Sequence, residues 1–508
     1  MSLAPAKPPA GSVRHWLDRR ARETPDRVSH IFAEDESRLT WAELRTRAAA
    51  IAGRLAGLGI AKGESVALCL ANGRDAVLCL FGTLYGGFRA TALNLAAGPE
   101  AMGYAIGHSR ARFVFVGEGQ RQTFEAALAC HAAAVSVLAV NHGIDWPEAS
   151  DSAALEAVNE GDQALLMYTS GTTGRPKGVV HSQASLLAGG WTAALAHQLS
   201  TVDRALCVLP YFHINGLCVT LMGPLVSGGS AVVAEKFSAS RFWQQCGQFE
   251  ATWFSVVPTI ISHLLHGEMA PAKAVVERLR FARSASSALA PQVQTAFEER
   301  FGIPIVETMG LTETAAQILA NPLPPGVRKV GSPGLAIGNE ARIVGARGKA
   351  GTGEQGEIAV RGPNVMLEYL DDPEATRETF TADGWLLTGD LGHMDRDGYV
   401  FVTGRRKELI IKGGENIAPR EVDEALYSHP DVVEAAAFGR ACQTYGQRVA
   451  AAVKLKPGSK ASEEDLLAIC RDRLGAFKCP DAIFLLDELP KGPSGKIQRL
   501  KLAAALTR

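Results

Sequence analysis

The sequence lacks the features by which secreted, membrane-spanning and zinc-stabilised proteins are recognised. Its 9 cysteines include no Cys-x-x-Cys pair and mostly lie in apolar runs. This pattern predicts reduced, buried thiols in a cytoplasmic protein instead of a zinc site or a disulfide framework. The N-terminus shows no apolar core of a signal peptide. The uncharged stretch from Leu217 to Ala234 is interrupted by Pro224 and by Gly228-Gly229, so we expect buried core there and no membrane span.

The chain also lacks an excess of either charge. Lys plus Arg number 52 and Asp plus Glu number 53, which gives a formal net charge of -1 over 508 residues. This balance argues against a protein that coats nucleic acid or an anionic membrane. Hydrophobic residues make up 47% and charged residues 21%, as in ordinary globular proteins. A core of this size needs neither disulfides nor a structural metal.

Helix and strand patterns alternate through the first two thirds of the chain. Thr40 and Glu43 form a capping box, and apolar residues then recur every three or four positions, which predicts a helix over 40–58. Helical patterns such as Pro291–Phe301 separate several apolar runs that are typical of buried strands. These runs are Ser65–Leu70, Phe113–Val116, Ala164–Tyr168, Ala205–Leu209, Ala231–Ala234, Thr252–Val257 and Pro304–Thr308. Such alternation favours parallel sheets covered on both faces.

The character of the sequence changes after Val330. Turn signals such as Asp383-Gly384 and Asp397-Gly398 predict an antiparallel, hairpin-rich region, which we expect to form a small β-barrel. The last hundred or so residues mix helices and strands and have the size of a separate small domain. The predicted fold class is therefore α/β. A large N-terminal domain, residues 1–404, holds two parallel-type α/β subdomains plus the barrel, and residues 405–508 form a small α+β domain.

A loop rich in glycine and hydroxyl groups follows the predicted strand Ala164–Tyr168. Its sequence, YTSGTTGRPKG, permits turns whose consecutive N–H groups form a concavity for an anion. It is not a Walker A loop, because Pro176 precedes the lysine and Gly178 follows it. We favour phosphate binding over a flexible surface turn. The expected ligating residues are Thr169, Ser170, Gly171, Thr172, Thr173 and Lys177.

This loop resembles the phosphate loop of the adenylate-forming superfamily, which includes acyl-CoA synthetases, adenylation domains of peptide synthetases and luciferases. The string MGLTET, residues 309–314, is similar to the family's YGxTE signature. The resemblance implies that Thr312 contacts phosphate and that Glu313 helps to hold Mg²⁺. Met309 stands where relatives usually have an aromatic residue, and methionine can also pack against a ring. Further residues expected beside the nucleotide are Ser287, Ala288, Thr308 and Gly310.

Three later motifs resemble the same family. The string WLLTGD ends in Asp390, which would accept hydrogen bonds from the ribose hydroxyls. The string GRRKE, a solvated basic cluster in isolation, resembles the family's hinge, in which Arg405 also reaches the ribose and Lys407 is the pivot. The C-terminal PKGPSGKIQR would bring Lys496 into the active site for adenylation.

The resemblance covers essentially the whole chain and implies an ATP-dependent acyl-CoA synthetase. Such an enzyme converts a carboxylate, ATP and coenzyme A into acyl-CoA, AMP and diphosphate through an acyl-adenylate. The small C-terminal domain would be mobile and rotate about Lys407 between the two steps, and Gly413 and Gly414 would then line a narrow pantetheine channel. A stand-alone adenylation enzyme that loads a separate carrier protein, and a non-catalytic nucleotide-binding relative, are the alternatives.

The acid substrate is less well specified by the sequence. The string PYFHINGL, residues 210–217, resembles the stretch that borders the acyl pocket in relatives. His213 could gate or bind the carboxylate, and a packed core histidine is an equally good interpretation. His213 and Asn215 could recognise a polar end group, so we expect a short or medium, polar carboxylate. The sequence leaves open whether the protein is a monomer or a homodimer.

Overall fold

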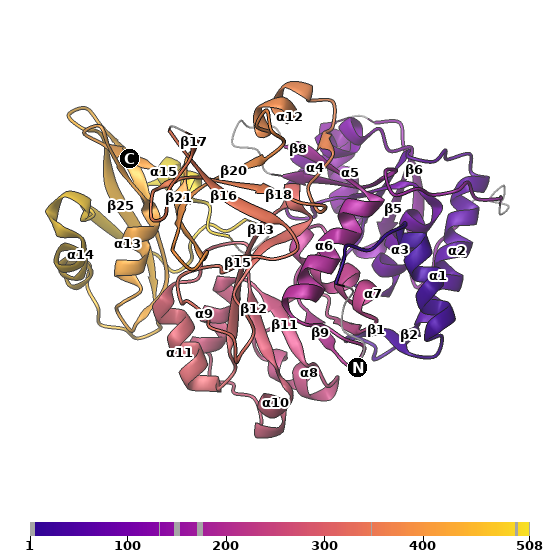
Figure 1. The fold of residues 1–508 in the computed structure, drawn as a ribbon, viewed down its shortest axis with the longest axis horizontal. Coiled ribbons are helices and arrows are strands. Elements are labelled where there is room, and N and C mark those ends of the chain that lie inside the picture. Colours follow the sequence, from indigo (N-terminus) through magenta and orange to yellow (C-terminus); the bar gives the residue numbers. More distant parts are fainter. Residues whose placement is uncertain are drawn as a thin grey trace.

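The computed structural model describes residues 6–131, 133–146, 153–169, 176–346, 348–492 and 496–506. Two large sheets and the helices around them occupy the right and centre of Figure 1, and the C-terminal segment forms a separate lobe at the left. The predicted loop residues Ser170, Gly171, Thr172 and Thr173 lie outside the described residues.

A sheet of seven strands forms the first α/β layer. Strands β7, β4, β3, β5 and β6 run parallel, and β8 and β19 extend the sheet in antiparallel fashion. Strands β3 and β5 are buried along their whole length, as expected for strands covered on both faces, whereas β6 at the edge is partly exposed. In sheet order the strands are β19 (Glu368–Tyr369), β8 (Lys177–Ser182), β7 (Gln163–Thr169), β4 (Arg89–Ala92), β3 (Ser65–Cys69), β5 (Phe113–Gly117) and β6 (Ser136–Val140).

A sheet of nine strands forms the second layer. Its central strands, from β13 to β1, are all parallel, whereas β2, β14 and β15 are antiparallel at the edges. In sheet order they are β15 (Leu335–Ala336), β14 (Ala316–Ala320), β13 (Ile305–Leu311), β12 (Phe281–Ser284), β11 (Trp253–Val256), β9 (Arg204–Cys207), β10 (Ser230–Val233), β1 (Val28–Phe32) and β2 (Arg38–Thr40). All seven predicted strands are found in these two sheets, with small shifts at their ends.

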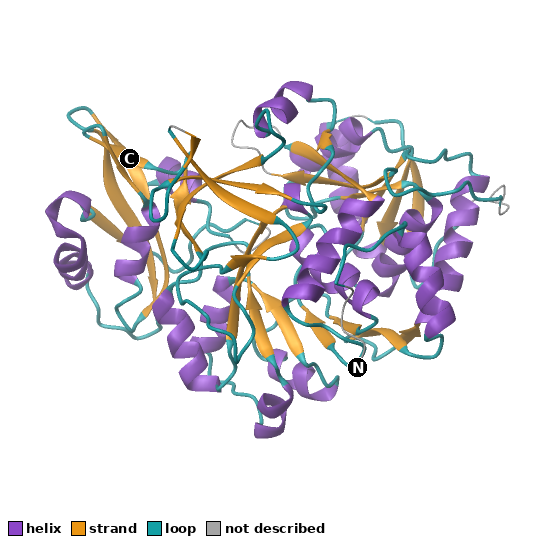
Figure 2. Ribbon diagram, in the orientation of Figure 1, coloured by secondary structure: helices purple, strands orange, loops and turns teal. Residues whose placement is uncertain are grey.

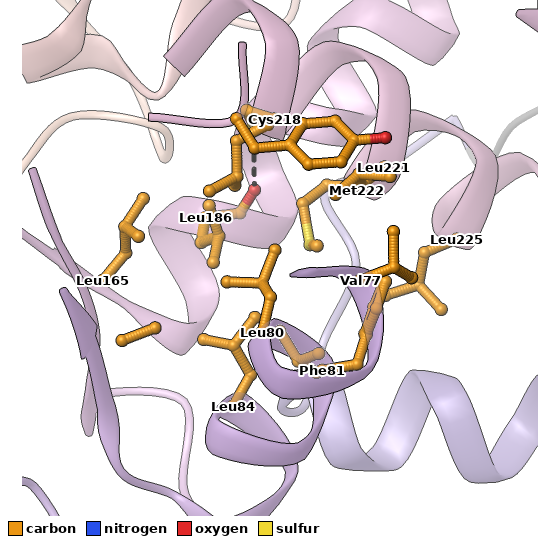
Figure 3. Packing of buried hydrophobic residues seen from close by; sticks show 14 of the residues in the cluster. Val77, Leu80, Phe81, Leu84, Leu165, Leu186, Cys218, Leu221, Met222 and Leu225 are labelled. Atoms are coloured by element: carbon orange, nitrogen blue, oxygen red, sulfur yellow. Dashed lines mark hydrogen bonds between the residues drawn. The ribbon is translucent and has the colours of Figure 1, made fainter. Parts of the chain in front are cut away.

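Helices cover and separate the two sheets. Helix α6 contacts β7 and β8 on one side and β14 on the other, so it lies between the layers. Figure 3 shows apolar side chains of α3, α6 and η2 meeting in this middle layer, with Phe81 and Leu84 among them. The helices before residue 330 are α1 (Val13–Glu23), α2 (Trp41–Gly57), α3 (Arg74–Gly86), α4 (Pro99–Ser109), η1 (Glu118–Gln120), α5 (Arg121–Cys130), α6 (Gln183–Ala196), η2 (Asn215–Met222), α7 (Gly223–Ser227), α8 (Phe242–Gln248), α9 (Pro258–His266), α10 (Lys273–Arg278), α11 (Pro291–Phe301) and η3 (Thr312–Thr314).

Local sequence signals explain where several helices begin. Thr40 caps α2 through its hydroxyl, which accepts from the Glu43 amide at 3.2 Å, while the Glu43 carboxylate accepts from the Thr40 amide at 2.8 Å. This is the predicted capping box. The uncharged stretch from Leu217 to Ala234 is buried and divides among η2, α7 and β10. Within the described residues, no helix combines the length and apolarity needed to cross a bilayer.

The prediction that the region after Val330 closes into a β-barrel is wrong. The region after Val330 is antiparallel and rich in hairpins, as expected, but its strands form an open sheet with β17 and β21 as unpaired ends among the described residues. Five short strands are too few to close around a core unless they tilt and stagger strongly. In order they are β17 (Gly348–Lys349), β16 (Glu340–Gly345), β18 (Gly356–Arg361), β20 (Leu386–Met394) and β21 (Val400–Arg405); helix α12 (Pro373–Thr379) lies beside them.

The C-terminal lobe has its own sheet and its own core. The sheet order is β23 (Glu415–Ile417), β22 (Ile410–Lys412), β25 (Gly446–Leu455) and β24 (Val432–Cys442), and β26 (Ala482–Leu485) pairs with β25. The lobe's helices are α13 (Pro419–Leu426), α14 (Glu463–Lys478) and α15 (Arg499–Ala505), visible at the left of Figure 2. The mixture of helices and strands predicted for this part of the chain is confirmed.

Candidate active site

A cavity of about 190 Å³ lies where the nine-stranded sheet, the five-stranded sheet and the C-terminal lobe meet. Segments more than 200 residues apart in the sequence contribute to its wall. The residues that the sequence predicts for the site and that line this cavity are Ser287, Ala288, Thr308, Met309, Gly310, Asp390, Arg405 and Lys496. The structure therefore brings together four of the predicted motifs.

One wall comes from the carboxyl ends of two neighbouring parallel strands. Strands β12 and β13 pair in register, so the turn after Ser284 lies beside Thr308 to Gly310. The Thr308 hydroxyl donates to the Ser284 carbonyl at 3.1 Å and joins the two strand ends. A Cβ on Gly310 would lie 1.3 Å from the Ala316 carbonyl oxygen, so only glycine fits there. The edge of a parallel sheet at its carboxyl end is a common place for a ligand.

The opposite wall carries an ion pair across the antiparallel strands β20 and β21. Asp390 and Arg405 face each other in the register of these strands, and Arg405 Nε donates to Asp390 Oδ1 at 2.7 Å. The Asp390 carboxylate keeps its second oxygen for another donor. Burial raises the pKa of Asp390, and the cations Arg405 and Lys496 oppose that rise. A carboxylate of this kind is a strong acceptor for the hydroxyl groups of a ligand.

The C-terminal lobe contributes Lys496 to the same cavity. Its ammonium lies 3.6 Å from Glu408 Oε1, and Arg499 Nε lies 3.5 Å from Glu408 Oε2. Arg499 is held in turn by Asp423 of α13. Burial and the neighbouring Arg405 lower the pKa of Lys496, while Glu408 and Asp390 act in the opposite direction. Glu408 and Arg499 therefore orient the lysine, a role that the sequence analysis did not assign to them.

A second group of residues surrounds the base of the glycine-rich loop. The Tyr369 hydroxyl donates to Glu313 Oε1 at 2.8 Å, and the Lys177 ammonium lies 4.7 Å from the centroid of the Tyr369 ring. Burial raises the pKa of Tyr369, so its hydroxyl stays protonated and donates. Tyr369 thus links the loop lysine to the carboxylate predicted to hold a metal. Sequence reasoning missed it because it comes from the short strand β19, remote from every motif.

His181 is another residue that sequence reasoning missed. It is fully buried, its Nε2–H donates to the Thr312 carbonyl at 2.7 Å, and its Nδ1 lies 3.1 Å from the Ser185 hydroxyl. Burial lowers the pKa of His181 to about 4, so the imidazole is neutral at physiological pH. His181 lies on β8, three residues after the end of the glycine-rich segment, and its contact joins this strand to η3, which carries Thr312.

Neither the predicted residues Thr169, Lys177, Thr312 and Glu313 around the glycine-rich loop nor four further ones, Lys407, Gly413, Gly414 and His213, line the cavity. Lys407 is exposed in the turn between β21 and β22. Gly413 and Gly414 form the exposed turn between β22 and β23, with φ of 59° and 88°. His213 precedes η2 and lies edge-on to Phe212, with ring centroids 4.9 Å apart. The roles assigned to these residues stay predictions.

Glu313 is a suitable ligand for a magnesium ion that arrives with a polyphosphate. Tyr369 orients one of its carboxylate oxygens and leaves the other available. Mg²⁺ prefers oxygen ligands and commonly binds through one or two carboxylates together with substrate phosphates. Within the described residues, no cluster of three or more His, Cys, Asp or Glu side chains forms a metal site. The residues present thus fit a metal held mainly by the substrate.

Comparison with known proteins identifies the family. The model of the AMP-binding enzymes matches residues 17–370, and the model of their C-terminal domain matches residues 421–496. This chain belongs to the AMP-binding enzyme family. The resemblance to the adenylate-forming superfamily found in the motifs is thereby confirmed, and the two matched segments correspond to the large N-terminal part and the small C-terminal part of the fold.

Three relatives of this AMP-binding enzyme match it over nearly their whole length. It is 45% identical to the sulfoacetate–CoA ligase of Cupriavidus necator over 494 residues, covering 95% of this chain and 96% of that protein. It is 37% identical to the oxalate–CoA ligase of Arabidopsis thaliana, with coverages of 95% and 96%. It is 34% identical to the 2-succinylbenzoate–CoA ligase of Bacillus licheniformis, with coverages of 96% and 99%.

Solved structures of MatB from Rhodopseudomonas palustris allow the arrangement of the lobes to be compared. The ATP-bound form matches this AMP-binding enzyme with a TM-score of 0.89 at 28% identity, covering 98% of this chain and 99% of that one. The apo form, with the same identity and coverages, gives a TM-score of 0.78. The arrangement described here is therefore closer to the ATP-bound form of that protein.

Proposed function

We propose that this AMP-binding enzyme is an ATP-dependent acyl-CoA synthetase whose substrate is a short acid with a second anionic group. The cavity that joins Lys496 of the C-terminal lobe to Asp390, Arg405 and the end of β13 carries the proposal. The names of the three relatives support coenzyme A as the thiol. They do not favour the alternative, an adenylation enzyme that loads a carrier protein.

The first step joins the acid to AMP. A carboxylate oxygen of the acid forms a bond to the α-phosphorus of ATP, and the bond from that phosphorus to diphosphate breaks. Negative charge grows on phosphate oxygens in the transition state, so preorganised cations and donors lower the barrier. Lys496 and Lys177 supply positive charge, and Asp390 with Arg405 holds the ribose. Glu313 would help to hold Mg²⁺ together with the polyphosphate, and the ion would supply further positive charge.

The second step transfers the acyl group. The thiol sulfur bonds to the acyl carbon, the bond from that carbon to the AMP oxygen breaks, and the thiol proton is released. Lys496 occupies the cavity in the arrangement described here, so we infer that the C-terminal lobe rotates about Lys407 to clear it. Residues 1–404 and 405–508 are the two bodies of this motion, and Gly413-Gly414 then faces the pantetheine arm.

The acid class follows from what the relatives have in common. Sulfoacetate, oxalate and 2-succinylbenzoate each carry a carboxylate and a second anionic group. Monocarboxylic fatty acids share only the first of these features. This refines the short or medium, polar carboxylate expected from the sequence, and it requires a cationic partner for the second group within the acyl site.

A panel assay tests the proposal. The purified protein is incubated with ATP, Mg²⁺, coenzyme A and one acid at a time, and AMP release and acyl-CoA mass are followed. We expect AMP and diphosphate with a dianionic acid, and no ADP. Lys496→Ala should lower acid-dependent pyrophosphate exchange about 10²- to 10³-fold, whereas the exposed Lys501→Ala on α15 serves as the control. ADP formation, or AMP release without acyl-CoA, would contradict the proposal.

A further inference from the structure

The core beside the cavity contains a guanidinium without an acidic partner. Arg283 lies on β12 and is 1% exposed. Its Nη1 donates to Asn215 Oδ1 at 2.6 Å and to Ser255 Oγ at 3.0 Å, and its Nε donates to Gln317 Oε1 at 3.1 Å. All three acceptors are neutral. Within the described part of the chain, no carboxylate forms an ion pair with Arg283 or influences its charge.

This arrangement is unfavourable for the protein alone. Taking a guanidinium out of water requires several kcal/mol, and neutral acceptors restore only part of that energy. By contrast, the two partly exposed arginines that line the cavity have acidic partners, because Arg405 is paired with Asp390 and Arg499 with Asp423. Burial lowers the pKa of Arg283 to about 9, the direction expected for a cation without a counter-charge. An anion that binds beside Arg283 would remove this penalty.

The position of Arg283 connects it to the reaction site. Asn215, the residue that accepts from Arg283, donates through Nδ2 to the Ser286 hydroxyl at 3.2 Å. Ser286 lines the nucleotide cavity and has a φ of 74°. A short chain of hydrogen bonds therefore runs from the cavity wall to the buried guanidinium. Ser286 directly precedes Ser287 and Ala288, two of the residues that the sequence analysis expected beside the nucleotide.

The backbone around Asn215 has the form often found at ligand sites. Asn215 is the first residue of the π-helix η2, and π-helical turns occur frequently at functional sites. The apolar side chains of η2, such as Leu221 and Met222, pack toward α3 in the middle layer (Figure 3). Asn215, at the polar first position of η2, is thus held in place by the packing of the apolar residues that follow it. His213 lies two residues earlier in the segment that the sequence predicts for the acid.

We propose that Arg283, with Asn215 and Ser286, forms the subsite for the second anionic group of the acid, a carboxylate or a sulfonate. The inference rests on the proposed function and assigns the cation that this function requires. In the complex, an anionic oxygen takes the place of a neutral acceptor on the guanidinium. Charge-assisted bonds of this kind are about twice as strong as neutral ones. The reacting carboxylate then points to the nucleotide cavity on the other side of Ser286.

Matched pairs of acids test the subsite in the wild-type protein. Malonate, succinate and sulfoacetate are each compared with the neutral counterpart malonamate, succinamate or sulfamoylacetate, with kcat/KM measured by ATP–pyrophosphate exchange. We expect at least one dianionic acid to exceed its partner about 100-fold, as for a buried charge pair. The sulfonate and the carboxylates together show which anion fits. Equal kcat/KM within every pair would overturn the subsite, and no exchange with any acid would count against the proposed function itself.

Variants then locate the effect at Arg283. Arg283→Gln keeps a hydrogen-bonding side chain but removes the charge, and should abolish the preference within pairs while AMP binding, measured by calorimetry, is unchanged. Arg280→Gln, three residues earlier and paired with Asp203, is the matched control and should keep the preference. An equal loss for both members of each pair would show a structural role and refute the proposal. If Arg283→Gln does not fold, the comparison of matched acid pairs in the wild-type protein tests the subsite.

Discussion

Removal of a single hydroxyl tests the link between the glycine-rich loop and Glu313. In Tyr369→Phe the ring stays, so the contact with Lys177 at 4.7 Å from the ring centroid is kept. The hydrogen bond from its hydroxyl to Glu313 Oε1, at 2.8 Å, is lost. Tyr369 is 7% exposed, so water cannot easily replace its hydroxyl. The change therefore separates the orientation of the carboxylate from the packing of the lysine.

The expected size follows from the chemistry of the bond. A hydrogen bond to a charged group contributes roughly 1.5–3 kcal/mol, which corresponds to about a tenfold to hundredfold loss of kcat/KM for adenylation. Because the affected carboxylate is the predicted metal ligand, the apparent requirement for Mg²⁺ should also rise. Tyr369→Leu, which removes the ring as well, should lose up to a further tenfold through the cation–π contact. Pyrophosphate exchange measured over a range of Mg²⁺ concentrations gives both kcat/KM and the apparent requirement for Mg²⁺.

Tyr399 provides a matched control. Its hydroxyl donates to the neutral Val327 carbonyl at 2.6 Å, and the Lys329 ammonium lies 4.4 Å from its ring centroid, so it also combines a hydroxyl donor with a lysine over its ring, outside the residues that line the cavity. Tyr399→Phe should lower the free energy of unfolding through the lost hydrogen bond. It should leave the rate of pyrophosphate exchange unchanged. Wild-type exchange by Tyr369→Phe at every Mg²⁺ concentration would refute the role given to its hydroxyl.

Three further predictions concern the lysines and the buried histidines. Lys496 must be protonated to act. Because its pKa is lowered, Lys496 loses its proton at a lower pH than an ordinary lysine does. The rate of pyrophosphate exchange should therefore fall at a lower pH than expected for an ordinary lysine, and this fall should move to higher pH in Lys496→Arg. If the fall stays at the same pH in the variant, another group causes it. Lys407→Pro should slow thioester formation more than adenylation, because it stiffens the pivot, whereas Lys407→Ala should not; equal losses in both half-reactions would contradict rotation. His181, with its pKa lowered to about 4 in the folded state, favours folding when neutral. Its contribution is present above the unfolded pKa of about 6.5 and is lost as pH falls toward 4, about 2 kcal/mol between pH 7 and 5. The urea midpoint of His181→Gln should fall less over this range, and an identical pH slope would refute the assignment.

The nucleotide half of the site was predictable because its residues lie in short, contiguous motifs. The MGLTET motif begins in β13 and ends in η3, and the parallel pairing of β12 with β13 brings Ser287, Ala288 and this motif to one edge of the sheet. Asp390 and Arg405 are 15 residues apart and meet because β20 and β21 form one antiparallel pair. Spacing, turn chemistry and residue type thus carried enough information for these positions.

The supporting residues were not predictable in the same way. Tyr369 belongs to a two-residue strand, β19, whose pairing with β8 depends on the whole sheet. Arg283 lies in an apolar run and carries no local signal of its burial. The barrel prediction was wrong for a related reason, since hairpin signals indicate antiparallel pairing but say nothing about whether the end strands meet. Contacts between distant segments decide all three cases.

Strand β14 connects Arg283, the cation of the proposed acid subsite, to the segment that carries Glu313, the predicted metal ligand. Gln317, which accepts from Arg283, lies on β14 three residues after the end of η3, and the Asn364 amide donates both to the Thr314 carbonyl at 2.7 Å and to the Gln317 carbonyl at 3.0 Å. The Asn364 amide thereby ties the two carbonyl groups together, while its own Oδ1 is buried without a hydrogen-bond partner among the described residues. An anion that repositions Arg283 therefore acts on the segment that carries Glu313. The same contacts that would select a dianionic acid would also align the catalytic carboxylate, so selection of the acid and its activation need not be separate events.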